Sequence, residues 1–151
     1  MKIAEMLKEG LVATGFTARD KAEALPKLLD LVGERLSPEH RALVLEALIA
    51  RERVASTGLD NGIAMPHARV EIPGDVIVAL AVSPAGVPFQ SADGKPTRIL
   101  ALLVIPTSQM QKGIKLLADA ARLLSYEEVR EGLARARTPR EALEVLRSHE
   151  S

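Results

Sequence analysis

The chain has 151 residues, of which 47% are hydrophobic, and its 20 basic and 20 acidic side chains give a formal net charge of zero. These values fit one globular domain over residues 1–151, argue against disorder, and leave no overall field that would attract nucleic acid. Cysteine is absent and only two Phe and one Tyr occur, which excludes disulfides, a cysteine nucleophile and thiolate metal sites and leaves little for base stacking.

Apolar stretches are short throughout the chain. The longest, residues 99–105, falls far below the roughly 20 residues that span a bilayer. The N-terminus also lacks the basic and then apolar pattern of a secretory signal. We therefore expect a cytoplasmic protein with no direct membrane insertion.

Two amphipathic helices are predicted in the first third of the chain. Residues 19–34 carry apolar side chains at helical spacing, with Thr17 in reach as a cap. Pro26 lies inside that pattern, so we expect a kink or a later helix start there. Ser37 followed by a proline predicts the start of the second helix, which should end near residues 51–53.

Two buried strands and three more helices are predicted further along. Residues 76–82 and 99–105 are apolar runs of seven residues, typical of strands covered on both faces, with a loop between them. Ser108, Ser125 and Thr138 are predicted to cap helices, the last two through capping boxes. We therefore expect an α/β fold: a three-layer α/β/α sandwich with a central mixed β-sheet flanked by about five helices.

The segment 51–69, RERVASTGLDNGIAMPHAR, combines residues suited to phosphoryl chemistry. Arg51 offers a planar fork to a phosphate, the Ser-Thr-Gly turn offers hydroxyls and close backbone amides, and a proline presents His67 from a stiff platform. Together these are the parts of a phosphorylated-histidine site: a nucleophilic imidazole, a cation and neutral donors. The same residues also fit a surface histidine beside ordinary turns. His40 and His149 are expected to be solvated.

This segment resembles the active-site signature of the fructose/mannitol-type (type 2) enzyme IIA family of the phosphotransferase system, which includes a nitrogen-regulatory branch. The resemblance extends over nearly the whole chain and is carried by Arg51-Glu52, Ser56-Thr57-Gly58, Gly62-Ile63-Ala64 and Pro66-His67.

The resemblance implies a phosphohistidine carrier rather than a stand-alone turnover enzyme. His67 would accept a phosphoryl group from the histidine phosphocarrier protein, with Arg51 and Thr57 steadying the phosphoryl oxygens and with no cofactor or metal. The group would then pass to a IIB component in sugar uptake, or act as a regulatory signal on a target protein in the nitrogen-regulatory type. The sequence identifies neither the sugar nor the target.

The chain departs from the family pattern at one position. Many members carry a second, supporting histidine near the start of the helix after the last strand, and that position falls at about Gly113 here. Lys112 and Lys115 are the candidates to supply part of the lost donor capacity, as point charges rather than a polarised ring. A regulatory binding protein that keeps the fold but does not transfer phosphate is therefore the alternative.

Two other kinds of site fit the sequence less well. A hydrolase could use Ser56 or Thr57 as nucleophile with His67 as base, but no nucleophile-elbow pattern surrounds either hydroxyl. A zinc site is a poorer fit still, because three well-separated histidines without cysteine make a poor ligand set.

Overall fold

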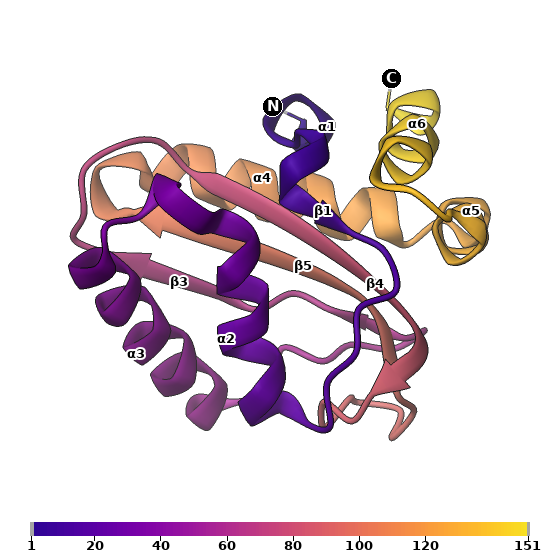
Figure 1. The fold of residues 1–151 in the computed structure, drawn as a ribbon, viewed down its shortest axis with the longest axis horizontal. Coiled ribbons are helices and arrows are strands. Elements are labelled where there is room, and N and C mark those ends of the chain that lie inside the picture. Colours follow the sequence, from indigo (N-terminus) through magenta and orange to yellow (C-terminus); the bar gives the residue numbers. More distant parts are fainter. Residues whose placement is uncertain (1, 151) are drawn as a thin grey trace.

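A central five-stranded sheet organises residues 2–150, the part of the chain that the computed structural model describes (Figure 1). The strand order is β1-β4-β5-β2, and β3 pairs with β5 beside β2. β4 runs antiparallel to β5 and the other pairs are parallel, so the sheet is mixed, as predicted. The strands are β1 (Val12–Ala13), β2 (Ile63–Ala64), β3 (His67–Val70), β4 (Ile77–Val87) and β5 (Thr97–Pro106).

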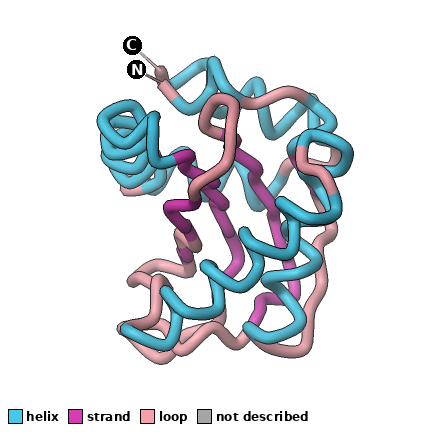
Figure 2. Tube along the Cα trace, turned by 90° about the vertical axis from the view of Figure 1, so that its left-hand side faces the viewer, coloured by secondary structure: helices cyan, strands magenta, loops and turns pink. Residues whose placement is uncertain are grey.

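Helices cover both faces of this sheet, which confirms the predicted three-layer sandwich (Figure 2). Six α-helices lie within residues 2–150, where the sequence predicted about five. They are α1 (Ile3–Met6), α2 (Lys21–Val32), α3 (Pro38–Val54), α4 (Met110–Leu124), α5 (Glu127–Arg135) and α6 (Pro139–His149). Three short 3-10 helices are η1 (Glu9–Leu11), η2 (Gly33–Arg35) and η3 (Thr107–Gln109).

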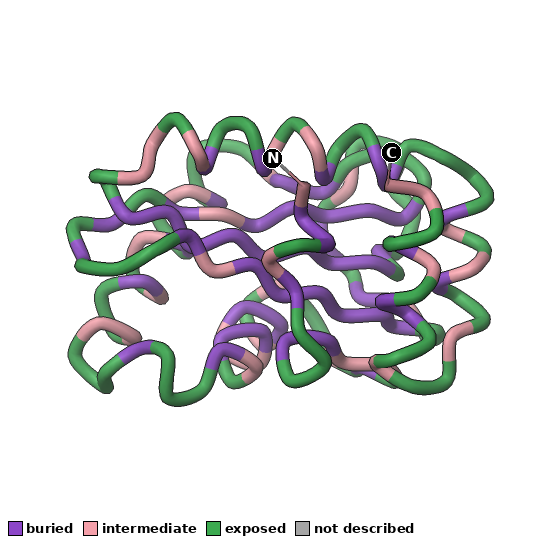
Figure 3. Tube along the Cα trace, turned by 90° about the horizontal axis from the view of Figure 1, so that it is seen from above, coloured by how far each residue is buried: buried purple, intermediate pink, exposed green. Residues whose placement is uncertain are grey.

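The two predicted apolar strands divide the core into two clusters. Successive side chains of a strand point to opposite faces. Leu80 and Leu103 therefore pack under α1, α4, α5 and α6, whereas Ala81 and Leu102 pack under α2 and α3. Figure 3 shows the consequence, since the buried stretches run along the middle layer and the exposed ones along the outer helices.

The start of α2 differs from the prediction. Asp20, not Thr17, caps the helix, with its carboxylate accepting a hydrogen bond from the Glu23 amide at 2.9 Å. The helix runs through Pro26 instead of starting there.

The other predicted helix starts have mixed outcomes. Ser37 and Thr138 cap α3 and α6 as expected. The capping box at Ser125 is wrong, because this residue closes α4 and its hydroxyl donates to the Arg122 carbonyl at 2.6 Å. Ser108 lies in η3, and α4 begins without a side-chain cap. α3 ends at Val54, just past the expected 51–53.

The strands differ from the sequence prediction in two places. β4 continues through Pro84 to Val87, where a loop was expected, and its pairing with β5 shifts register between Val82 and Val87. Such irregularities let proline occur within a strand. β3 was not predicted, and it begins at His67.

Candidate active site

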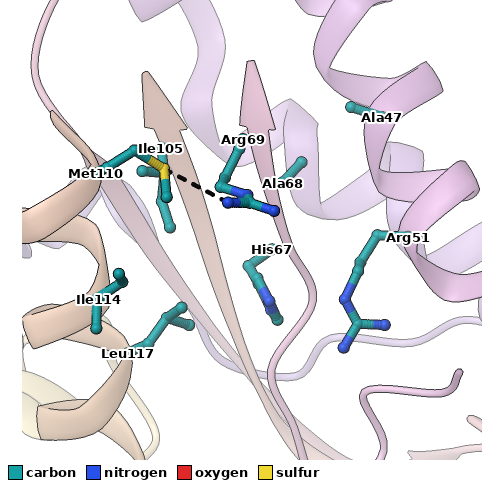
Figure 4. Close-up of a pocket in the computed structure, with 9 residues that line it drawn as sticks. All are labelled: Ala47, Arg51, His67, Ala68, Arg69, Ile105, Met110, Ile114 and Leu117. Atoms are coloured by element: carbon teal, nitrogen blue, oxygen red, sulfur yellow. Dashed lines mark hydrogen bonds between the residues drawn. The ribbon is translucent and has the colours of Figure 1, made fainter. Parts of the chain in front are cut away.

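Two of the three predicted site residues, Arg51 and His67, meet at one edge of the sheet. Among the described strands β3 pairs only with β5, so β3 is an edge strand, and a cavity of about 360 Å³ lies beside it between α3 and α4 (Figure 4). Its lining residues are Ala47 and Arg51 of α3, His67, Ala68 and Arg69 of β3, Ile105 of β5, and Met110, Ile114 and Leu117 of α4.

His67 is held by its own chain. Its Nδ1 lies 2.8 Å from the carbonyl oxygen of Met65. A carbonyl can only accept, so Nδ1 carries the proton and Nε2 keeps its lone pair. The intervening Pro66 is itself fixed, because its carbonyl accepts a hydrogen bond from the Leu103 amide at 3.1 Å. The half-buried imidazole therefore has one defined tautomer with a nucleophilic Nε2.

A tight turn brings the Ser-Thr-Gly segment back to this carbonyl. Asn61 and Gly62 have φ values of 65° and 75°, the left-handed conformation that Asn-Gly turns favour. The turn places Leu59 against Ile63, with an N···O distance of 2.7 Å, and the Met65 amide against the Thr57 carbonyl at 3.1 Å. The segment before the turn thus supports the residue that orients His67.

Thr57 lies at the centre of this support and not in the cavity. It is buried, its hydroxyl donates to the Glu52 carboxylate, and its amide lies 3.1 Å from Glu52 Oε2. The structure therefore brings Arg51 and His67 together at the cavity, but places the Thr57 hydroxyl elsewhere.

Glu52 is a buried carboxylate that the sequence showed only as part of the signature. Lys21 of α2 donates to it at 2.7 Å and also to Ser56 Oγ at 3.0 Å. The Lys21 ammonium lies 4.8 Å from the centroid of the Phe89 ring. A buried charge is tolerated when it is paired and hydrogen-bonded. This network, which we call the Lys21–Glu52–Thr57 cluster, ties α2 and α3 to the signature loop.

Arg51 is anchored at the end of α3. Its Nη1 donates to the carbonyl of Ala55, the residue that directly follows the helix, at 2.8 Å. The guanidinium is half-buried and extends beside the His67 ring in Figure 4. A guanidinium has five N–H donors, so further donors are left for an anion in the cavity.

The second-histidine position is closed. Gly113 is buried, and a Cβ built on it would lie 2.5 Å from Cγ2 of Ile105. The two expected substitutes do not line the cavity: Lys112 pairs with Asp75 at 2.7 Å, and Lys115 is exposed on α4. Instead, α4 supplies the cavity with an apolar wall.

Arg69 is the charged lining residue that sequence reasoning missed. It follows His67 by two positions on β3, so both side chains leave the strand toward α4, while Ala68 faces the opposite core. Had β3 been predicted, its period of two would have placed Arg69 beside His67.

The remaining polar candidates lie outside the cavity lining. Neither His40 nor His149 lines it. Ser56 donates to the Phe89 carbonyl at 2.8 Å and Thr57 to Glu52, so within residues 2–150 neither hydroxyl is hydrogen-bonded to His67. The geometry gives no support to the hydrolase alternative.

Residues 2–150 contain neither a cluster of metal-binding side chains nor a helix that could span a membrane. Their His, Asp and Glu side chains form no group of three placed to hold a metal ion. None of the helices described there combines the length and the apolar character needed to cross a membrane.

Comparison with known proteins gives consistent matches over most of the chain. The family described as "Phosphoenolpyruvate-dependent sugar phosphotransferase system, EIIA 2" matches residues 5–149. A "PTS system fructose-specific EIIA component" from Haloferax volcanii is 33% identical over 126 residues, covering 83% of this chain and 82% of that protein. A "Nitrogen regulatory protein" from Pseudomonas aeruginosa is 29% identical over 146 residues, with coverages of 97% and 95%.

A solved structure shows the same fold. The crystal structure of nitrogen regulatory protein IIA-Ntr from Neisseria meningitidis superposes with a TM-score of 0.86 at 28% sequence identity. The match covers 95% of this chain and 98% of that one.

Proposed function

Because the chain belongs to the EIIA 2 family of the phosphoenolpyruvate-dependent sugar phosphotransferase system, we propose that it carries a phosphoryl group on Nε2 of His67. The observation that carries the proposal is the 2.8 Å contact between Nδ1 and the Met65 carbonyl, because it leaves Nε2 as the nucleophile. The proposed donor is the phosphohistidine of the histidine phosphocarrier protein. The proposed acceptor is a IIB component or a regulatory target protein, and the expected compartment is the cytoplasm.

The transfer needs no separate base. Nε2 of His67 attacks phosphorus in line as the P–N bond of the donor phosphohistidine breaks, and the electron pair of that bond returns to the donor nitrogen. Each ring keeps the proton on its other nitrogen. The positive charge that phosphorylation places on the His67 ring strengthens the hydrogen bond from Nδ1–H to Met65.

Two predicted site residues take different parts in this proposal. Arg51 binds the phosphoryl oxygens directly from the end of α3. Thr57 acts indirectly, because its hydroxyl donates to Glu52 and its carbonyl accepts from the Met65 amide. Its contribution is to hold the carbonyl that orients His67.

The relatives leave two physiological roles open. One is described as a fructose-specific component and two as nitrogen regulatory proteins. Sugar uptake and regulation both follow from the same phosphohistidine. The closed position at Gly113 favours a third candidate, a regulatory binding protein that does not transfer phosphate.

Phosphorylation in a reconstituted relay tests the proposal. The purified chain is incubated with phosphoenolpyruvate, enzyme I and the phosphocarrier protein, and its intact mass is measured. We expect one acid-labile, base-stable phosphoryl group that is absent from His67→Ala and present in the control His149→Ala. An unmodified wild-type chain would contradict the proposal and favour the non-transferring binding protein.

A further inference from the structure

The cavity beside His67 has a second cation besides Arg51. The Arg69 guanidinium lines it from β3, and its Nη1 lies 4.0 Å from the Sδ atom of Met110. It forms no ion pair with a carboxylate of residues 2–150. A neutral thioether is a weak acceptor, so an incoming anion has no strong contact to displace.

Nearby cations differ from Arg69 in this respect. Lys112 is paired with Asp75 and Lys21 with Glu52, each at 2.7 Å. Arg51 uses one N–H on a backbone carbonyl. Arg69 is therefore the cation of the cavity whose donors are the least occupied.

The charge of the lining suits a dianion. Of its nine residues, two are arginines, one is His67 and none is acidic. The other six are apolar: Ala47, Ala68, Ile105, Met110, Ile114 and Leu117. Arg69 and Ile114 are exposed, so Arg69 would meet the phosphoryl group at the mouth of the cavity. A phosphoryl group carrying up to two negative charges would relieve the repulsion between the two guanidinium groups.

We propose that Arg69 is a second phosphoryl-binding residue, contacting the group on His67 Nε2 opposite Arg51. The inference rests on the proposed function and deepens it. Arg69 supplies from β3 the support that Gly113, which has no side chain, does not supply from α4; a Cβ there would lie 2.5 Å from Cγ2 of Ile105. Its planar fork binds two phosphoryl oxygens at once, which a lysine cannot do in the same way.

The position of phosphotransfer equilibrium measures this contact directly. Wild-type chain, Arg69→Gln and Arg69→Lys are each mixed with a fixed ratio of phosphorylated to free phosphocarrier protein, and the phosphorylated fraction is read by intact mass. Arg140→Gln is the charge-matched control, because Arg140 lies on α6 outside the cavity lining.

We expect Arg69→Gln to lower the equilibrium constant about tenfold or more, the usual effect of losing a hydrogen bond to a charged group. Arg69→Lys should fall between it and the wild type, and the control should equal the wild type. If Arg69→Gln and the wild type had equal phosphotransfer equilibrium constants, with His67 phosphorylated in both, the proposed role of Arg69 would be overturned. The proposed function would still stand. A wild-type chain that is never phosphorylated overturns both.

Arg69→Lys also keeps the test valid if the glutamine variant fails to fold, since it retains the charge and removes only the fork. An equilibrium constant for Arg69→Lys equal to that of the wild type would then exclude bidentate binding as proposed.

Discussion

The Thr57 carbonyl accepts a hydrogen bond from the Met65 amide at 3.1 Å, and the Met65 carbonyl in turn accepts one from Nδ1 of His67. Thr57 is also bound to Glu52 at the end of α3, one residue from Arg51. One short path of hydrogen bonds therefore joins α3, the helix that carries Arg51, to the imidazole ring of His67.

Replacing Thr57 tests this path. Thr57→Val keeps the shape but leaves a buried carboxylate oxygen without its hydroxyl donor, and we expect a loss of about 1 to 3 kcal/mol in the free energy of unfolding, measured in urea. His67 phosphorylation should also slow. Thr57→Ser retains the hydroxyl and serves as the control. If His67 were phosphorylated slowly in Thr57→Ser but at the wild-type rate in Thr57→Val, the proposed hydrogen-bond path would be contradicted.

Glu52→Gln should be more damaging, because it removes the buried carboxylate and leaves the largely buried Lys21 ammonium, 15% exposed, without its counter-charge. We expect a loss of about 3 kcal/mol or more in the free energy of unfolding. Glu46→Gln, an exposed position on the same helix, is the matched control and should be near neutral. Equal stabilities of the two variants would show that the Lys21–Glu52–Thr57 cluster contributes nothing.

Gly113→Ala tests whether α4 packs too closely on β5 for any side chain. The added Cβ would meet Ile105 atoms at 2.5 to 2.9 Å, so we expect a loss of about 1 to 3 kcal/mol. In an Ile105→Ala background the same change should become neutral or stabilising, since alanine favours helix. Gly10→Ala, with nothing within 4 Å, is the control. Additive effects of the two substitutions would contradict the close packing.

Glu150 should make stability depend on pH. Its side chain is 6% exposed, and burial, together with the nearby Asp119 carboxylate, raises its pKa above 4.5, although a hydrogen bond from the Ala4 amide opposes the shift. The folded state then binds more protons than the unfolded state, so this contribution to stability is complete below pH 4.5 and is lost as pH rises through the raised pKa.

The pKa of Asp119 is shifted in the opposite direction to that of Glu150, so the two carboxyl groups affect stability in different pH ranges. Burial acts to raise its pKa, but hydrogen bonds from Arg122 and the Ile3 amide outweigh burial and hold it below 3.8. Its contribution is therefore lost as pH falls below that range. Unfolding measured from pH 4 to 7 should show a decline in wild type that is reduced in Glu150→Gln. If the wild type and Glu150→Gln lost the same stability between pH 4 and pH 7, the raised pKa assigned to Glu150 would be contradicted.

Local signals predicted part of this structure well. Ser37 and the proline after it define the start of α3 because a cap depends on adjacent residues. The same logic failed at Ser125, where the end of α4 takes the serine before the next helix begins. β3 has no apolar run to reveal it, since it alternates polar and apolar residues over only four positions and depends on pairing with distant β5.

In the candidate site, too, features set by neighbouring residues were predicted and features set by distant contacts were not. The signature pointed to Arg51 and His67, and both line the cavity; their proposed roles follow from residue type and spacing. Arg69 was missed because its place depends on the unpredicted strand. The direction of the Thr57 hydroxyl depends on a carboxylate whose burial requires Lys21 from another helix, and no local pattern carries that information.

The most direct test of the central claim is the nitrogen spectrum of the His67 ring, recorded by long-range proton–nitrogen NMR before and after phosphorylation by the phosphocarrier protein. We expect the free ring at neutral pH to be protonated on Nδ1, as its 2.8 Å bond to Met65 requires, and the phosphoryl group to be attached to Nε2. A phosphoryl group on Nδ1, or a ring unchanged by the relay, would contradict the account.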